Sequence, residues 1–176
     1  IIDNRRLIAW GLDKFLGDQQ ISNRLGHGPM AGRSPMTLGA EAAATIHQRF
    51  SSLFRDDVPQ AAQVSGLTMD QLRGGGLSRN KVVAIQDLAE KSLDGTLKPL
   101  RIMTRLDDEE VIENLCIVRG IGPWTAQMFL IFDLGRPDVM PATDLGVQKG
   151  VQTVYGALDL PTPAETLERT RHLAPY

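Results

Sequence analysis

The sequence has one cysteine, no long apolar run and no excess of positive charge. A lone Cys116 excludes an internal disulfide framework and a four-cysteine iron–sulfur cluster. No apolar stretch approaches the roughly 20 residues that a membrane-spanning helix needs. Residues 1–6 carry charges where a secretory signal needs its apolar core. We therefore expect a protein of a reducing, cytoplasmic setting that has no membrane partner.

The charge balance also limits the argument for nucleic acid as a partner. The 176 residues include 19 Lys and Arg against 21 Asp and Glu, for a formal net charge of −2. A chain with this balance offers no global attraction to DNA. Any affinity for DNA must come from local basic residues and backbone amides. The length is sufficient to bury a core as one domain or as two small lobes.

Apolar residues recur at helical spacing along most of the chain, and no convincing pair of strands appears. Ser78 is suited to cap one helix, and Asp107 with Glu110 is typical of a capping box at the start of another. Segments 23–41 and 135–143, which contain Gly and Pro, favour loops. The predicted helices cover residues 7–16, 40–54, 57–65, 68–73, 79–94, 107–116, 123–134 and 145–155. The expected fold is all-α, a two-lobed helical bundle.

The stretch between two of these helices, residues 115–126, is unusual. Gly120 and Gly122 bracket a single apolar residue, Ile121, which indicates a tight turn whose backbone can approach another molecule closely. Pro123 suits the first position of the second helix, because its missing N–H would be unpaired there anyway. The unpaired N–H groups at a helix start attract anions. The helix–hairpin–helix arrangement therefore predicts a backbone site for a phosphate.

This hairpin, the Pro-Trp-Thr-Ala sequence that begins at Pro123 and the Pro-Ala-Thr-Asp-Leu-Gly element at 141–146 together resemble one known family. It is the helix-hairpin-helix superfamily of base-excision DNA glycosylases, and the bacterial DNA-3-methyladenine glycosylase II type is most similar. The resemblance covers roughly residue 42 to the C-terminus. It implies a monofunctional enzyme that flips damaged bases out of duplex DNA and hydrolyses the N-glycosidic bond of alkylated purines.

The resemblance implies that Asp144 is the catalytic carboxylate. Breaking the bond between a base and its sugar builds positive charge on the sugar, and an ionised carboxylate beside it stabilises that charge. An N-cap of the helix that begins at Leu145 is the alternative role of Asp144, and the two roles are compatible. We expect the Asp144 carboxylate and the Trp124 indole to face one shared cleft.

Trp124 occupies the position at which strand-cutting relatives carry a Lys nucleophile. Tryptophan cannot form a Schiff base, so the resemblance implies base release without strand cleavage. Trp124 would stack on a cationic base in the pocket, and hydrophobic packing is the alternative. Gln19 would line the same pocket and Gln20 would fill the gap left in the DNA stack. The inserted loop at 23–41 departs from the family pattern there, and a polar helix end remains the other interpretation of both glutamines.

The resemblance implies further DNA contacts from the hairpin and from local basic residues. The expected contacts, beside Gln20, are Gly120, Gly122, Thr125, Arg79, Lys81 and Lys149. For the three basic residues, solvated surface charge is an equal alternative. Relatives also hold a monovalent cation on hairpin carbonyls. In this sequence the corresponding residues are Cys116, Val118 and Ile121, and no other cofactor is expected.

The predicted organisation is one glycosylase core over residues 1–176, with a helical lobe at 42–106 and the hairpin and catalytic loop at 107–155. The final family helix looks truncated after Tyr176. We expect a monomer that acts on double-stranded DNA with damaged bases. Three alternatives remain: a non-enzymatic hairpin DNA-binding module, an inactive truncated remnant, and a helical domain that binds only other proteins.

Overall fold

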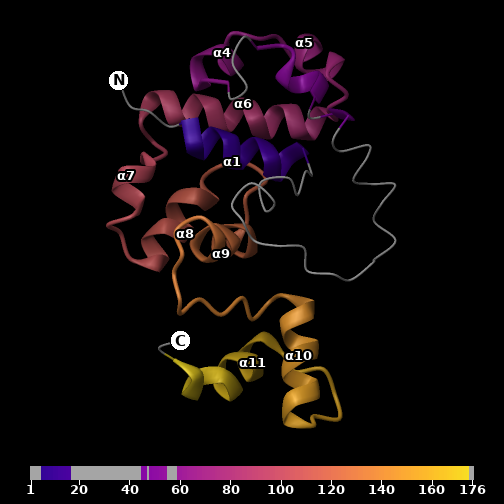
Figure 1. Cartoon of the computed structure of the whole chain (residues 1–176), viewed down its shortest axis with the longest axis vertical. Helices are drawn as coiled ribbons and strands as arrows, with labels where there is room; N and C mark the ends of the chain where they lie inside the picture. Colours follow the sequence, from indigo (N-terminus) through magenta and orange to yellow (C-terminus); the bar gives the residue numbers. More distant parts are fainter. Residues whose placement is uncertain (1–4, 17–44, 47, 55–58, 175–176) are drawn as a thin grey trace. The chain divides into compact units, whose positions relative to one another are not determined.

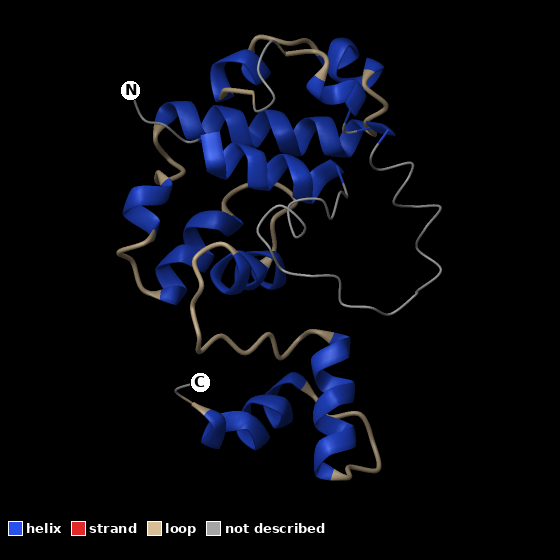
Figure 2. Cartoon of the chain, in the orientation of Figure 1, coloured by secondary structure: helices blue, strands red, loops and turns tan. Residues whose placement is uncertain are grey.

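The computed structural model describes residues 5–16, 45–46, 48–54 and 59–174. Every regular element in these ranges is a helix, and they contain no strand (Figures 1 and 2). The all-α prediction is therefore confirmed. None of the helices described is long and apolar enough to span a membrane.

The chain divides into two compact units, and each is described by itself. Unit 1 contains Ile1–Arg105 together with Ile117–Gly120, and unit 2 contains Leu106–Cys116 together with Ile121–Tyr176. The four residues of the hairpin turn thus belong to unit 1, whereas the helices on either side of the turn belong to unit 2. The predicted lobe boundaries at 42–106 and 107–155 and the truncated final helix stay predictions.

Unit 1 is built around α6 (Arg79–Asp94). The helix begins where the Ser78 hydroxyl accepts a hydrogen bond from the Lys81 N–H (3.4 Å), and it ends at Gly95 in the left-handed conformation (φ +81°). Its apolar side is buried, with Val82 and Leu88 fully covered. Three helices pack against it, which are α1 (Arg5–Leu16), α4 (Ala61–Ser65) and α5 (Met69–Gly74). Figure 1 shows α1 lying alongside α6.

The predicted boundaries in unit 1 hold where a local signal marks the helix end. Ser78 caps α6 as predicted. The helix predicted from residue 57 begins only at Ala61, after Gln60 as N-cap. Of the helix predicted over 40–54, residues 45, 46 and 48–51 are helical, and part of the range lies outside the described residues. The short α7 (Leu100–Met103) was not predicted, because four residues are too few to show a helical period.

Unit 2 contains two pairs of packed helices. In the first pair, α8 (Asp108–Cys116) contacts α9 (Pro123–Phe132), and in the second, α10 (Leu145–Tyr155) contacts α11 (Pro163–Thr170). A short 3-10 helix, Arg171–Leu173, follows. The capping box before α8 is confirmed: the Glu110 N–H donates to the Asp107 carboxylate (2.8 Å), and the Asp107 N–H donates to the Glu110 carboxylate (3.2 Å).

One prediction about burial in unit 2 was wrong, and one predicted helix side is only partly covered. The almost wholly apolar run from Gln127 to Leu134 predicts a deeply buried second hairpin helix, but Phe132 is 55% exposed although Phe129 and Leu130 are covered. The spacing of Val147, Val151 and Val154 predicts that they share one side of α10, and along that side Val151 is buried whereas Val154 is 79% exposed. The spacing of apolar residues defines a helix face. It does not say how much of that face another element covers.

Candidate active site

Asp144 lies at the N-terminus of α10, at the end of the loop that follows α9. One carboxylate oxygen, Oδ1, accepts hydrogen bonds from the backbone N–H groups of Gly146 (2.7 Å) and Val147 (3.1 Å). The residue is therefore the N-cap of this helix, as predicted. A Cβ at Gly146 would lie 2.9 Å from the same oxygen, so glycine is needed for the carboxylate to lie this close to the helix end.

Trp124 reaches the other carboxylate oxygen from the first turn of α9. Its indole Nε1–H donates a hydrogen bond to Asp144 Oδ2 at 2.7 Å, across 20 residues of sequence. The indole remains 38% exposed. The two residues expected to face one cleft are thus in direct contact within unit 2, and simple burial in a core does not account for Trp124.

These contacts keep the Asp144 carboxylate ionised. The pKa of Asp144 lies below that of an ordinary aspartic acid, chiefly because the Val147 N–H and then the Trp124 indole N–H stabilise the charged form. Partial burial acts in the opposite direction, and the Gly146 N–H adds to the lowering. A carboxylate with a lowered pKa is a weak proton acceptor and a steady negative charge. The arrangement suits electrostatic stabilisation of a nearby cation better than general-base chemistry.

The hairpin turn lies in unit 1 and packs closely there. Val118 is buried, at 1% exposure. Gly120 adopts the left-handed conformation (φ +84°), and a Cβ on it would lie 3.1 Å from the Phe15 ring and 3.5 Å from Ala84 Cβ. Both the conformation and the space therefore require glycine at position 120. The turn is a fixed feature of unit 1.

Gly122 has a different role from Gly120. It is the N-cap of α9 in an extended conformation (φ −106°), with Pro123 at the first helical position as predicted. No heavy atom in the described structure lies within 4 Å of the position of a Cβ on Gly122. The start of α9 therefore has no capping side chain and has open space next to it. Both are properties of helix ends that accept an anion.

The remaining predicted site residues are described only in part, and they are divided between the two units. Gln19 and Gln20 lie outside the described residues. Thr125 is buried on α9, at 6% exposure, so a DNA contact from it would have to come from its backbone. The basic side chains are at least partly exposed, as phosphate contacts require; they are Arg79, Lys81 and Lys149.

The predicted cation site would use backbone carbonyls of the hairpin. The carbonyl ligands expected at Cys116, Val118 and Ile121 are divided between the two units, so this cation site stays a prediction. Among the residues described, no three His, Cys, Asp or Glu side chains form a group that could hold a metal ion.

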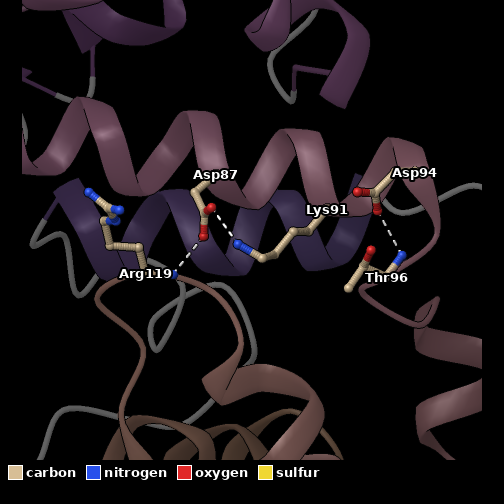
Figure 3. A network of polar contacts seen from close by, with 5 residues as sticks. All are labelled: Asp87, Lys91, Asp94, Thr96 and Arg119. Atoms are coloured by element: carbon tan, nitrogen blue, oxygen red, sulfur yellow. Dashed lines mark hydrogen bonds and ion pairs between the residues drawn. The ribbon is translucent and has the colours of Figure 1, made fainter.

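Sequence reasoning missed Asp87 on α6. Its carboxylate accepts a hydrogen bond from the Arg119 N–H in the hairpin turn, at 2.7 Å (Figure 3). The sequence shows only an Asp four residues before Lys91, which resembles an ordinary helix ion pair. No local pattern could reveal a partner 32 residues away.

The glycine turn before α9 defines a helix–hairpin–helix protein. Asp144, which caps α10 and accepts the hydrogen bond of the Trp124 indole from α9, is its candidate active-site carboxylate. Comparison with known proteins agrees. Residues 38–175 match the HhH-GPD superfamily of base excision DNA repair proteins, and the chain belongs to this family.

Two relatives, one of them named a putative DNA-3-methyladenine glycosylase, point to one branch of the superfamily. The chain is 33% identical over 140 residues to DNA-3-methyladenine glycosylase 1 of Schizosaccharomyces pombe. The match covers 79% of this chain and 61% of that protein. A Bacillus subtilis relative is 31% identical, and the match covers 79% of this chain and 50% of that protein. The chain therefore spans between half and two thirds of the length of these relatives.

Solved structures give the same result. The S. pombe 3-methyladenine DNA glycosylase in complex with abasic DNA has a TM-score of 0.68 and 27% identity, over 96% of this chain and 74% of that one. A DNA-3-methyladenine glycosidase from Bacillus halodurans has a TM-score of 0.70 and 28% identity, over 92% and 69%. The predicted family and fold are confirmed.

Proposed function

We propose that this chain is a monofunctional DNA glycosylase of base-excision repair, which hydrolyses the N-glycosidic bond of alkylated purines in duplex DNA. The observation that carries the proposal is the pair formed by Asp144 and Trp124: an ionised carboxylate, partly open to solvent and held by the indole N–H at 2.7 Å. The relatives named as 3-methyladenine glycosylases support the choice of substrate class.

In the proposed reaction, the damaged nucleotide first leaves the DNA stack, since its sugar is otherwise out of reach of a protein side chain. The bond between C1′ and the base nitrogen then breaks, and its electron pair leaves with the base. Positive charge develops on the sugar, and the Asp144 carboxylate stabilises it. Water adds its oxygen to C1′ and gives its proton to solvent, which leaves an abasic site. An alkylated purine already carries positive charge, so no strong general acid is needed.

Trp124 contributes to this chemistry in two ways. Its N–H orients the carboxylate, and its partly exposed ring is available to stack on an electron-poor base. An indole cannot act as the amine nucleophile that strand cleavage through a Schiff base requires. The proposed product is therefore an abasic site in an intact strand.

The hairpin would hold the DNA backbone. Gly120 sets the turn, and the uncapped start of α9 at Gly122 offers N–H groups to a phosphate. With a net charge of −2, the chain depends on this site and on scattered basic side chains such as Lys149 for its affinity. We propose that it acts as a monomer in the cytoplasm.

The test is a base-release assay on methylated duplex DNA, with Asp144→Asn as the variant. Asparagine keeps the shape and the capping oxygen but loses the charge. We expect the single-turnover rate to fall about 100-fold or more, while affinity for the same DNA stays close to that of the wild type. Asp159→Asn removes a charge from an exposed position of unit 2 and serves as the matched control.

Each alternative predicts a different result. Equal release by the wild type and Asp144→Asn would exclude Asp144 from the mechanism. DNA binding without release by the wild type would favour a binding module or an inactive remnant. A protein-interaction domain would show no affinity for DNA even at low salt, where phosphate contacts are strongest.

A further inference from the structure

Asp87 connects two parts of unit 1 that are far apart in sequence. Its Oδ2 accepts the hydrogen bond from the Arg119 N–H (2.7 Å), and its Oδ1 forms an ion pair with Lys91, one turn further along α6 (Figure 3). Partial burial raises the pKa of Asp87, but the Arg119 N–H and the Lys91 ammonium outweigh it, so the pKa lies below its ordinary value. The carboxylate is thus charged at neutral pH.

The hairpin turn also packs closely within unit 1. Val118 is buried, and a Cβ on Gly120 would lie 3.1 Å from Phe15 of α1 and 3.5 Å from Ala84 of α6, so Gly120 lies close to both helices. Ala84 and Asp87 are three residues apart on α6 and therefore lie on one face of it. The hydrogen bond to Asp87 is made on the same face that receives Gly120.

The hydrogen bond from the Arg119 N–H to Asp87 sets the direction of one peptide plane in the turn, which packing does not specify. The Arg119 N–H belongs to the peptide that joins Val118 to Arg119. A trans peptide is planar, and its C=O points opposite to its N–H. With the N–H directed at Asp87, the Val118 carbonyl is directed away from that carboxylate. The orientation of the polar groups in the turn therefore depends on Asp87.

The charge of Asp87 needs compensation if the turn is to bind a phosphate. A bare carboxylate close to the turn would repel an anion, because exposed charges still interact over about 8–10 Å at physiological salt. The Lys91 ammonium is paired with the same carboxylate and offsets its charge. The network can therefore orient the turn without making it repel DNA.

We propose that Asp87 is a positioning residue for DNA binding: it fixes the peptide between Val118 and Arg119 in the hairpin, and Lys91 offsets its negative charge. The inference rests on the proposed function, because it assumes that the hairpin contacts DNA. It assigns to a side chain of α6, outside the hairpin sequence, control over how the hairpin presents its backbone.

The test compares Asp87→Ala with Asp87→Asn and with a matched control. Alanine removes the acceptor, whereas asparagine keeps an oxygen that can accept the same N–H. The control is Asp94→Ala, on the same helix, where the carboxylate accepts the Thr96 N–H at the same distance of 2.7 Å but far along the helix from the hairpin contact (Figure 3). Affinity is measured by fluorescence anisotropy on duplex DNA with a stable abasic-site analogue.

We expect Asp87→Ala to weaken the affinity about tenfold, the effect of losing a hydrogen bond to a charged group. Asp87→Asn should stay within about threefold of the wild type, because a neutral acceptor keeps part of that bond. Asp94→Ala should match the wild type. Hydrogen–deuterium exchange of the peptide that contains Arg119 should be faster in Asp87→Ala only. At saturating methylated DNA, the single-turnover rate of Asp87→Ala should remain close to that of the wild type.

The outcomes separate this inference from the proposed function. If Asp87→Ala bound DNA as tightly as Asp94→Ala, the inference would be overturned. The proposed function would still stand, provided that the wild type released the base. If Asp87→Ala had a smaller active fraction but unchanged affinity for DNA, the role of Asp87 would be purely structural. This result would also overturn the inference. A wild type that binds DNA but releases no base would refute the proposed function alone, since the affinity comparison still decides the role of Asp87. A wild type that does not bind DNA would refute both.

Discussion

Replacing Trp124 by phenylalanine separates the two tasks proposed for this side chain. Phenylalanine keeps an aromatic face for stacking but has no N–H to donate to Asp144 Oδ2, where the indole now donates at 2.7 Å. A hydrogen bond to a charged group contributes about 1.5–3 kcal/mol when it is shielded from water. Because Trp124 is 38% exposed, water can replace part of this hydrogen bond in the variant. We therefore expect the variant to lose about 1 kcal/mol of transition-state stabilisation.

That loss should appear in the rate of base release. One kcal/mol corresponds to roughly a fivefold decrease in the single-turnover rate on methylated duplex DNA. Trp124→Ala should be slower than Trp124→Phe, since it also loses the aromatic face. Phe132→Leu, at an exposed aromatic about two turns further along α9, is the control and should leave the rate unchanged.

The pH dependence provides an independent readout of the same hydrogen bond. The indole N–H helps to lower the pKa of Asp144, so its removal should raise this pKa. Since the proposed mechanism needs the ionised form, the acid limb of the rate profile should move to higher pH in Trp124→Phe. An unchanged acid limb together with an unchanged rate would refute the proposal that the indole orients and stabilises the carboxylate.

Three further substitutions test the hairpin and the cap. Gly120→Ala should destabilise the fold by about 1–2 kcal/mol in chemical denaturation, because it places a Cβ at positive φ and 3.1 Å from Phe15. Gly122→Ala should leave stability nearly unchanged and weaken DNA affinity in anisotropy, since the added methyl occupies open space at the helix start. Asp144→Ala should cost about 1 kcal/mol of unfolding free energy at neutral pH through loss of the cap. Because the folded pKa of Asp144 is lowered, the part of this contribution that depends on the charge should be lost as pH falls through that pKa, and the stability difference between the variant and the wild type should narrow.

The parts of the fold that could be predicted are those with local causes. Ser78, Asp107 and Asp144 each mark a helix start through a side chain that binds N–H groups two or three residues ahead. Such signals lie within a few residues of one another, so they can be found without knowing the fold. The existence of α7 lacks a comparable signal, because its N-cap Pro99 has no capping side chain, and this helix was missed. The start of α4 was misplaced although the Gln63 side chain accepts the Gln60 N–H (2.7 Å), because Gln is not among the residues that typically mark an N-cap.

The contact between Asp144 and Trp124 could be anticipated as a shared cleft but not as a hydrogen bond. The family pattern selects Asp144 and Trp124 and implies one cleft for both. The hydrogen bond between them depends on how α9 and α10 are placed, which no spacing in the sequence states. The same holds for Asp87, whose partner lies 32 residues away, and for the exposure of Phe132.

The assignment of residues 117–120 to unit 1 has a practical consequence for dissecting the protein. A single cut after Arg105 would produce a first fragment without the turn that covers the Phe15 ring and Ala84, and its Asp87 would lose the backbone donor. The second fragment would retain the turn without the surface that shapes it. The two halves, expressed separately, should therefore fold less well than the intact chain. Mixing them should restore more folded structure than either half has alone.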